Sequence, residues 1–415
     1  MFFAFLSLAL AVPAPLHLEA LLREARENNP DLRAAEAEVR AAQASISPAG
    51  ALDDPMLMVQ LWNAPLDLSF VPVMVQLSQT IPLGGKLAAK RDSAQADFRA
   101  AQSNAAAKVS DIESEIARDY FVLFLADRTL AVDAEIGETL RTLESAAQVR
   151  VESGRGELSD QLKAQGEILK VQAELETAGA QRVSASAQIA VLLDRDPAEP
   201  LGPTGTPALL PSLPTEAALR EKALAARPEL KAAQAMIDSA QAQLRLARAL
   251  RVPDVNVSGA LMHNFGNSPG ESNFFFAGLQ ANLPLFEGRK NEPRIVAAEA
   301  QAEGRRAAAH NLRNKVLSEL AESYAQVVAE QHLIALHHQL IPLARQTLES
   351  SLSSYAAGRI PFLSVIDSER ELQLHELDLA MHLAAYEGHV AELEHAVGAD
   401  LGLSAVAESG HREAH

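Results

Sequence analysis

Histidines at a regular spacing near the carboxyl end are the residues of this sequence best suited to binding a metal ion. His375, His382 and His389 recur every seven residues on one face of a predicted helix. At ~1.5 Å of rise per residue, neighbours in this series lie about 10.5 Å apart along the helix axis, whereas zinc–nitrogen bonds are only about 2 Å long. His337 and His338 are adjacent and point in different directions on a helix. The pattern predicts a solvated stripe, no metal site and no cofactor.

The sequence also argues against an enzyme. It has no glycine-rich phosphate loop that ends in lysine, and Leu379 stands where the pair His375-Glu376 would need a second histidine to form a zinc helix. Cysteine is absent, which removes disulfides, thiolate metal sites and cysteine nucleophiles. Met56, Met58 and Met74 offer sulfur to a soft metal, but methionine is a general gap filler, so lipid-facing or packing roles are favoured.

Two very long helices must position whatever chemistry the chain carries. Residues 84–154 contain no proline and are rich in Ala, Glu, Gln, Arg and Leu, which predicts one uninterrupted helix of about 105 Å. Its apolar residues recur at steps of three and four, as at Ile112 and Ile116. Residues 287–356 predict a second such helix. Rods of this length cannot be buried in a compact domain, so we expect a bundle or a helical wall.

Charge and hydropathy argue against a nucleic-acid-binding protein and against a helical membrane protein. The net charge of -18 lacks the basic footprint of a nucleic-acid-binding protein and suits a wall or lumen that tolerates cations. No apolar window reaches ~18 residues, so no transmembrane helix is expected. Residues 1–14 form a short apolar run with small residues for cleavage, which predicts a signal peptide. The basic start of such a signal is missing, and a buried N-terminal helix is the alternative.

Two pairs of segments change from the helical period to a period of two. The first pair is Met56–Trp62 with Val73–Ile81, and the second is Val255–Leu261 with Ala277–Leu283. One face of each hairpin would meet an apolar environment and the other water, at lengths near the ~9 to 11 residues of a membrane-barrel strand. The residues predicted to mark these strands are Met56, Trp62, Val73, Leu77, Val255, Leu261, Leu279 and Leu283.

The second half of the chain repeats the plan of the first. Asn29-Pro30-Asp31-Leu32 is echoed by Arg227-Pro228-Glu229-Leu230, and Gly154-Arg155 is echoed by Gly358-Arg359. We predict a first repeat of helix, hairpin, long helix, turn and helix, and a second repeat with the same order. The predicted segments are the first repeat at 15–196, a proline-rich linker at 197–213, the second repeat at 214–400 and a polar tail at 401–415.

Four strands are too few to close a barrel, and lipid does not tolerate an open sheet edge. A homotrimer would supply twelve strands, an even number within the range of bacterial barrels. The predicted fold is therefore mainly α with a small β part. Long antiparallel α-helical hairpins form an α-barrel, and four β-strands per chain contribute to a trimeric 12-stranded transmembrane β-barrel.

The chain resembles the TolC-type outer-membrane efflux factor family from Leu16 to about Val397. The residues that carry the resemblance are the duplicated plan, Asn29-Pro30-Asp31-Leu32, Ile81-Pro82-Leu83-Gly84-Gly85-Lys86 and Tyr355-Ala356-Ala357-Gly358. Asp54-Pro55-Met56-Leu57 looks nearest to the heavy-metal cation branch. The resemblance implies a passive trimeric tunnel in the outer membrane of a Gram-negative cell, with a periplasmic helical extension. It implies a periplasmic adaptor (membrane fusion) protein and an inner-membrane resistance-nodulation-division pump as partners, and metal cations or drugs as exported substrates.

The resemblance also places a gate at the two helical turns. In the family, carboxylates and an arginine near these turns form the constriction, and Asp160 and Asp367 match the carboxylates. Ile360 and Ser364 stand where family members carry an arginine and a carboxylate, which leaves the roles of Arg155 and Arg359 open. The gate candidates are Gly154, Arg155, Asp160, Tyr355, Gly358, Arg359, Ser364 and Asp367. The simpler interpretation is that both aspartates are first-turn acids favoured by the helix dipole.

A soluble periplasmic coiled-coil scaffold or adaptor subunit is the alternative from another class of protein. In that case the alternating segments would form a small capping sheet. Adaptors usually need a lipoyl-like β domain of several strands, and the alternating segments here are too few. Recovery of the protein in the outer membrane or in the soluble fraction distinguishes the two interpretations.

Overall fold

The computed structural model describes residues 16–61, 72–154, 156–207, 213–263, 273–283, 285, 287–399 and 401. The predicted signal peptide, Trp62, Arg155 and all of the predicted polar tail except Leu401 lie outside the described residues. Within the described part of the chain, no helix combines the length and the apolar character that crossing a membrane requires.

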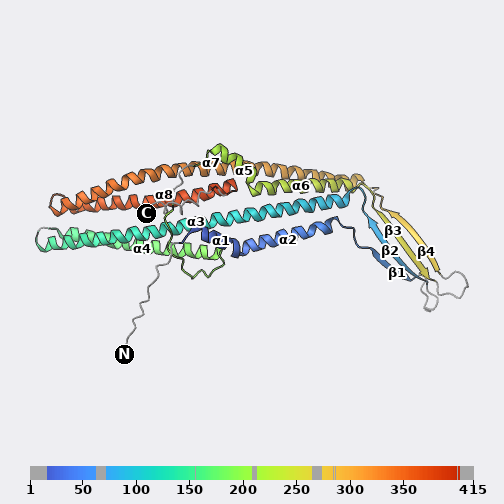
Figure 1. Ribbon diagram of the computed structural model, residues 1–415, viewed down its shortest axis with the longest axis horizontal. Coiled ribbons are helices and arrows are strands. Elements are labelled where there is room, and N and C mark those ends of the chain that lie inside the picture. Colours follow the sequence, from blue (N-terminus) through green and yellow to red (C-terminus); the bar gives the residue numbers. More distant parts are fainter. Residues whose placement is uncertain are drawn as a thin grey trace, which may run out of the picture. The chain divides into compact units, whose positions relative to one another are not determined.

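The helices and strands occur twice in the same order along the chain, which can be followed by the sequence colours in Figure 1. The order in each half is two short or medium helices, two strands, one very long helix and one helix of intermediate length. The first half comprises α1 (Leu18–Asn28), α2 (Pro30–Gly50), β1 (Met56–Leu61), β2 (Val73–Ile81), α3 (Lys86–Glu152) and α4 (Leu158–Leu192). The second comprises α5 (Glu216–Ala226), α6 (Pro228–Ala249), β3 (Val255–His263), β4 (Asn273–Ala281), α7 (Glu287–Ala356) and α8 (Phe362–Val397). The two predicted long helices are confirmed as α3 and α7.

Each half interrupts its first helical segment just before a proline. Between α1 and α2, the Asn29 side-chain oxygen accepts hydrogen bonds from the backbone nitrogens of Asp31 at 2.9 Å and Leu32 at 3.2 Å. Pro30 then opens α2, where its missing N–H costs nothing. Pro228 opens α6 in the same way, so the echoed Arg227-Pro228 separates α5 from α6. The buried Arg227 at this break donates to the Ala396 carbonyl at 3.1 Å and lies 3.0 Å from a Glu319 carboxylate oxygen.

The chain forms two compact units. Unit 1 comprises Met1–Arg33, Ala107–Arg227 and Lys315–His415, and unit 2 comprises Ala34–Ala106 and Pro228–Asn314. Unit 1 has two apolar cores. In the first, the predicted apolar residues of α3, among them Ile116 and Leu123, pack with Leu21 of α1 and Ile189 of α4. The second core is built from α3, α4, α7 and α8 and includes Leu140, Val171, Tyr355 and Phe362.

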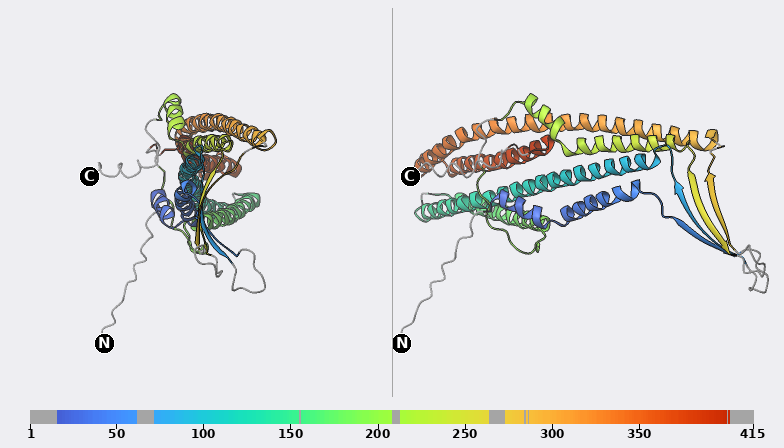
Figure 2. Two further views of the ribbon diagram at one scale, coloured as in Figure 1. Left: turned by 90° about the vertical axis from the view of Figure 1, so that its right-hand side faces the viewer. Right: turned by 45° about the vertical axis from the view of Figure 1, so that its right-hand side comes forward.

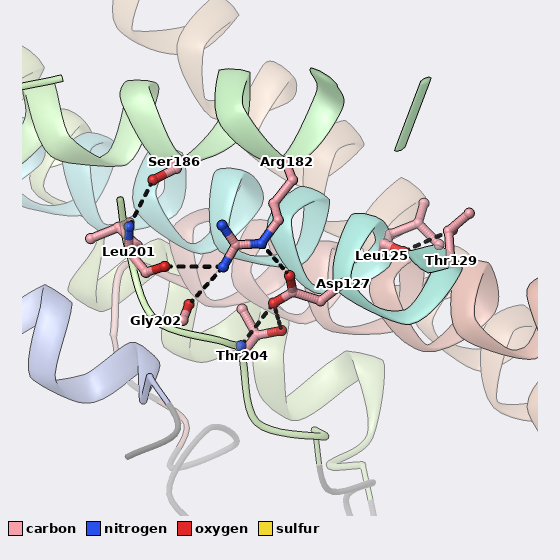
Figure 3. A network of polar contacts seen from close by, with 8 residues as sticks. All are labelled: Leu125, Asp127, Thr129, Arg182, Ser186, Leu201, Gly202 and Thr204. Carbon is pink, nitrogen blue, oxygen red and sulfur yellow. Dashed lines mark hydrogen bonds and ion pairs between the residues drawn. The ribbon is translucent and has the colours of Figure 1, made fainter. Parts of the chain in front are cut away.

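The segment that follows α4 is fixed to unit 1 by a polar network (Figure 3). Arg182 of α4 contacts Asp127 of α3 at 2.7 Å and donates to the carbonyls of Leu201 at 3.0 Å and Gly202 at 3.4 Å. The other Asp127 oxygen accepts from both the backbone nitrogen and the hydroxyl of Thr204, each at 2.9 Å. These contacts hold part of the predicted proline-rich linker in place.

Unit 2 contains one antiparallel sheet in which the four strands lie side by side in the order β1-β2-β3-β4 (Figure 2). Strand β2 leads into α3 through Gly84, which has a φ of +73°, and a Cβ at this position would lie 2.7 Å from the Val252 side chain. Lys86 is 5% exposed and contacts Asp254 at 2.6 Å and the Val252 carbonyl at 2.7 Å. The Gly-Gly-Lys sequence therefore closes the junction between the sheet and α3.

The bounds predicted for the last strand were wrong. We predicted 277–283, whereas β4 is Asn273–Ala281, so Leu283 follows the strand by two residues. Pairing with β3 fixes these bounds, because His263 lies opposite Asn273 and Val255 opposite Ala281. The run Phe274–Phe276 has no period of two, which hid the start of the strand from the sequence pattern.

Candidate functional site

One face of the sheet is apolar across all four strands. Directly opposed residues of antiparallel strands point to the same face, and the register aligns Val59, Val75, Leu261 and Phe275 in one row. Members of this face are widely exposed, with Leu261 62% and Phe275 72% exposed in the single chain. The other residues of this face in and beyond this row include Leu57, Leu61, Val73, Leu77, Ile81, Val255, Val257, Ala277, Leu279 and Ala281.

The opposite face carries most of the polar residues of the sheet together with the methionines, Phe274 and Phe276, whereas Gln79, His263 and Asn273 lie on the apolar face. Gln76, Ser78 and Thr80 of β2 lie on the second face, opposite Ala260, Ser258 and Asn256 of β3. The register places Met56, Met58 and Met74, for which lipid-facing or packing roles are expected, all on this second face. The sequence pattern could not assign the methionines to a face of the sheet, because β1 carries apolar side chains on both of its faces. Leu57, Val59 and Leu61 lie on one face, and Met56 and Met58 lie on the other.

The turn between α3 and α4 depends on glycine. Gly154 has a φ of +73°, and a Cβ there would meet nothing within 4 Å, so glycine is needed for the backbone conformation and not for space. Its nitrogen donates to the Val151 carbonyl at 3.0 Å. Asp160 follows in the first turn of α4, is half-buried, and its nitrogen donates to the Glu157 carbonyl at 3.1 Å.

The turn between α7 and α8 has the same design. Gly358 has a φ of +71°, and the Arg359 nitrogen reaches back to the Ser354 carbonyl at 2.9 Å, which ends α7. Tyr355 and Phe362 are buried on either side of the turn, with ring centroids 5.5 Å apart. The aromatic pair therefore fixes how α7 turns into α8.

Arg150 connects the two turns. Its guanidinium donates to the Tyr355 carbonyl at 2.6 Å and lies 4.6 Å from the centroid of the Tyr355 ring. Burial raises the pKa of the Tyr355 hydroxyl; Arg150 opposes this effect and Asp160 adds to it. Sequence reasoning did not select Arg150. The only signal for it was a cation in the last turn of a helix, which does not reveal its partner.

The remaining predicted gate residues lie at or just after the second turn, and the two candidate aspartates do not contact each other. Asp367 and Arg359 are exposed, and Ser364 is half-buried, with its carbonyl accepting from the Ser368 hydroxyl at 2.9 Å. In the described part of the chain, no hydrogen bond or ion pair joins Asp160 to Asp367. A direct pairing of the two candidate acids within one chain is therefore not part of the site.

Four carboxylates gather where α3, α4 and α8 meet in unit 1. Arg370 contacts both oxygens of Glu167, at 2.5 Å and 3.2 Å. Gln373 donates to Asp133 at 2.9 Å and to Glu174 at 3.2 Å. Glu369 is 3% exposed, and one of its oxygens has no hydrogen-bond partner in the described structure. In the described structure, α8 therefore contributes one guanidinium and one amide as hydrogen-bond donors to this acidic cluster.

The carboxyl groups of this cluster differ in pKa. Burial raises the pKa of the Glu369 carboxyl to about 7, and Glu167 adds to the effect. Burial also acts to raise the pKa of Glu167, but hydrogen bonds from Lys170 and Arg370 bring it below its ordinary value. Glu369 therefore takes up or releases a proton near neutral pH, and burial also raises the pKa of the Asp133 carboxyl.

We expect Glu369→Gln to stabilise the protein at alkaline pH. A carboxyl whose pKa is higher in the folded state contributes stability below its unfolded pKa, and that contribution is lost as pH rises through about 7. The variant should unfold like the wild type at pH near 5 and gain about 2 kcal/mol at pH near 8. Thermal unfolding at both pH values measures this. Glu371→Gln, an exposed position on the same helix, is the matched control, and equal gains for both variants would contradict the prediction.

Solved structures with this fold are outer-membrane channels. A structure described as the outer-membrane channel OprN aligns with a TM-score of 0.81 over 92% of this chain and 90% of that one, at 20% identity. A crystal structure of CusC aligns with a TM-score of 0.80 over 93% of each chain, at 19% identity. The helical hairpins and the four-stranded sheet of this chain therefore share the fold of these two proteins.

The family follows from the sequence comparison. The model of the outer membrane efflux protein family matches residues 21–195 and 219–399, and the chain belongs to this family. It is an outer-membrane efflux channel component with a periplasmic helical part, and not an enzyme. A relative, the cobalt-zinc-cadmium resistance protein CzcC of Cupriavidus metallidurans, is 26% identical over 86% of this chain and 84% of its own length. The cation efflux system protein CusC of Escherichia coli K12 is 22% identical over 86% and 80%.

Proposed function

We propose that three copies of this chain form a passive tunnel that exports metal cations across the outer membrane. The tunnel receives its substrate from a periplasmic adaptor and an inner-membrane pump of the resistance-nodulation-division type, which supplies the energy. The single observation that carries the proposal is the sheet of unit 2. It has one apolar face for lipid, one polar face for water, and two edge strands.

The edges argue for a trimer. Strands β1 and β4 each pair on one side only within the described chain, and an unpaired edge in lipid leaves backbone groups without partners. Pairing β4 of one copy with β1 of the next satisfies both edges. Three copies give twelve strands, which lies inside the range of bacterial barrels.

Metal cations are the favoured substrate class. The relatives CzcC, CusC and the nickel and cobalt resistance protein CnrC of Cupriavidus metallidurans are named for cations. The net charge of -18 and the four clustered carboxylates suit the passage of cations. The outer membrane protein OprJ of Pseudomonas aeruginosa, 24% identical over 80% of this chain, is a relative that is not named for a cation, so drugs are the second candidate class.

A deletion strain tests the substrate. Loss of this chain should lower tolerance to cobalt, zinc, cadmium or nickel salts, and the plasmid-borne gene should restore it. Unchanged metal tolerance with a lowered tolerance to drugs would transfer the proposal to the second class. Recovery of the protein in the soluble fraction would favour the scaffold interpretation.

We expect Arg150→Ala to increase the conductance of the reconstituted channel. Removing the guanidinium deletes the contact between the end of α3 and Tyr355 near the end of α7, so the two turns can separate. Single-channel recording in planar bilayers should show a severalfold rise, without loss of the trimer. Arg141→Ala, which removes an exposed arginine of the same helix, is the control, and equal conductance of both variants and the wild type would contradict a closing role for Arg150.

We expect Asp367→Asn to reduce the preference of the channel for cations. Asp367 is exposed just after the second turn, and three copies around a narrow axis would form an acidic ring of the kind that favours cations. Reversal potentials in a salt gradient measure the preference. A variant as cation-selective as the wild type supports the simpler interpretation, in which Asp367 only interacts with the helix dipole.

A further inference from the structure

Three possible metal ligands converge between α7 and α8 of unit 1, away from both turns. His337 of α7 and His375 and Asp378 of α8 each offer one ligand atom, and these atoms lie within 4.8 Å of one another. The imidazole rings of His337 and His375 are in edge contact, with centroids 5.5 Å apart. Two imidazoles and one carboxylate are thus held in one place by two neighbouring helices.

The cluster has unsatisfied nitrogen atoms. His337 is only 8% exposed, and its Nδ1 has no hydrogen-bond partner in the described structure. The Nδ1 of His375 is buried and also has none. Buried polar atoms of native proteins are almost always paired, so two unpaired imidazole nitrogens in one cluster point to a ligand that both would bind.

The arrangement follows a known way to build metal sites in helical bundles. His375 and Asp378 are three residues apart on α8, so they share one face of the helix, and the facing helix supplies the third ligand. His382 lies against His337, with ring centroids 5.2 Å apart, and its Nδ1 is 2.8 Å from a Glu330 carboxylate oxygen. This histidine–carboxylate pair packs beside the cluster and is not one of its three ligands.

We propose that His337, His375 and Asp378 bind one divalent transition-metal cation of the zinc type, with water as the fourth ligand. Two imidazoles and a carboxylate form a ligand set that zinc takes, whereas calcium and magnesium select oxygen ligands alone. In a tetrahedral site the ligand atoms lie about 3.4 Å apart, so small side-chain rotations complete the geometry. The bound ion joins α7 to α8 and is independent of the substrate that the channel exports.

Metal binding to the purified full-length protein tests the proposal. Untagged protein is stripped with a chelator and titrated with zinc chloride by calorimetry, and with cobalt chloride followed by visible absorption. The wild type should show one saturable zinc site per chain and the absorption bands of tetrahedral cobalt. His375→Gln and Asp378→Asn should each weaken zinc binding by more than about tenfold.

The controls separate this site from the acidic surface and from export. His338→Gln changes an exposed histidine beside His337, and His389→Gln changes one that pairs with Glu392 at 3.1 Å; both should bind zinc like the wild type. Circular dichroism verifies that each variant is folded. Absence of a saturable site, or equal zinc affinity in all variants, would overturn the proposal. Neither result depends on whether the channel exports metals.

Discussion

Leu261→Arg is expected to prevent assembly of the protein in the outer membrane. Leu261 lies on the apolar face of β3, between Val75 and Phe275, and its side chain is 62% exposed in the single chain. If this face meets lipid, an arginine there costs on the order of 2 to 4 kcal/mol per copy, and a trimer carries this cost three times. Outer-membrane fractions should therefore lack the heat-resistant trimer.

Met262→Arg is the matched control for this prediction. Met262 is the next residue of the same strand and points to the polar face, opposite Met74 and Phe274. An arginine there would line the water-filled side, so the trimer should assemble. Normal assembly of both variants would show that the apolar face does not meet lipid. Failure of Met262→Arg alone would show that the methionine face meets lipid.

Arg182→Ala should destabilise unit 1 by about 3 kcal/mol, the scale for breaking a largely buried ion pair. The substitution leaves the Asp127 carboxylate, whose side chain is 16% exposed, without its cation. It also leaves the Leu201 and Gly202 carbonyls without their arginine donor. The segment after α4 should then detach more readily, so limited proteolysis within residues 197–207 should become faster and the midpoint of thermal unfolding should fall.

An exposed ion pair provides the comparison for Arg182. Arg141 contacts Glu138 at 2.5 Å with both side chains more than half exposed, and Arg141→Ala should cost less than about 1 kcal/mol. Combining Arg182→Ala with Asp127→Ala in a double-mutant cycle isolates the pair itself. A midpoint for Arg182→Ala equal to that of Arg141→Ala would show that the network does not hold the segment.

Local sequence determined the elements of this protein. The abundance of helix-forming residues fixed the extent of α3 and α7 within a few residues, because helix formation depends on contacts three and four residues apart. Proline is absent from α3, whereas α7 continues through Pro293 and Pro342. Pro30 and Pro228 marked real breaks for the same local reason. The period of two located three of the four strands, and the repeated motifs indicated the duplicated order and the family.

Only the tertiary structure decided which distant side chains meet. Arg150 with Tyr355, Arg182 with Asp127, and His337 with His375 are separated by many residues, and each pairing depends on the axial register and rotation of packed helices. The seven-residue spacing along α8 considers only that helix, whereas the structure brings His337 of α7 beside His375 and Asp378. Likewise, the bounds of β4 and the face of the methionines came from pairing with β3 and β2, because a strand's register is set by its neighbour and not by its own residues.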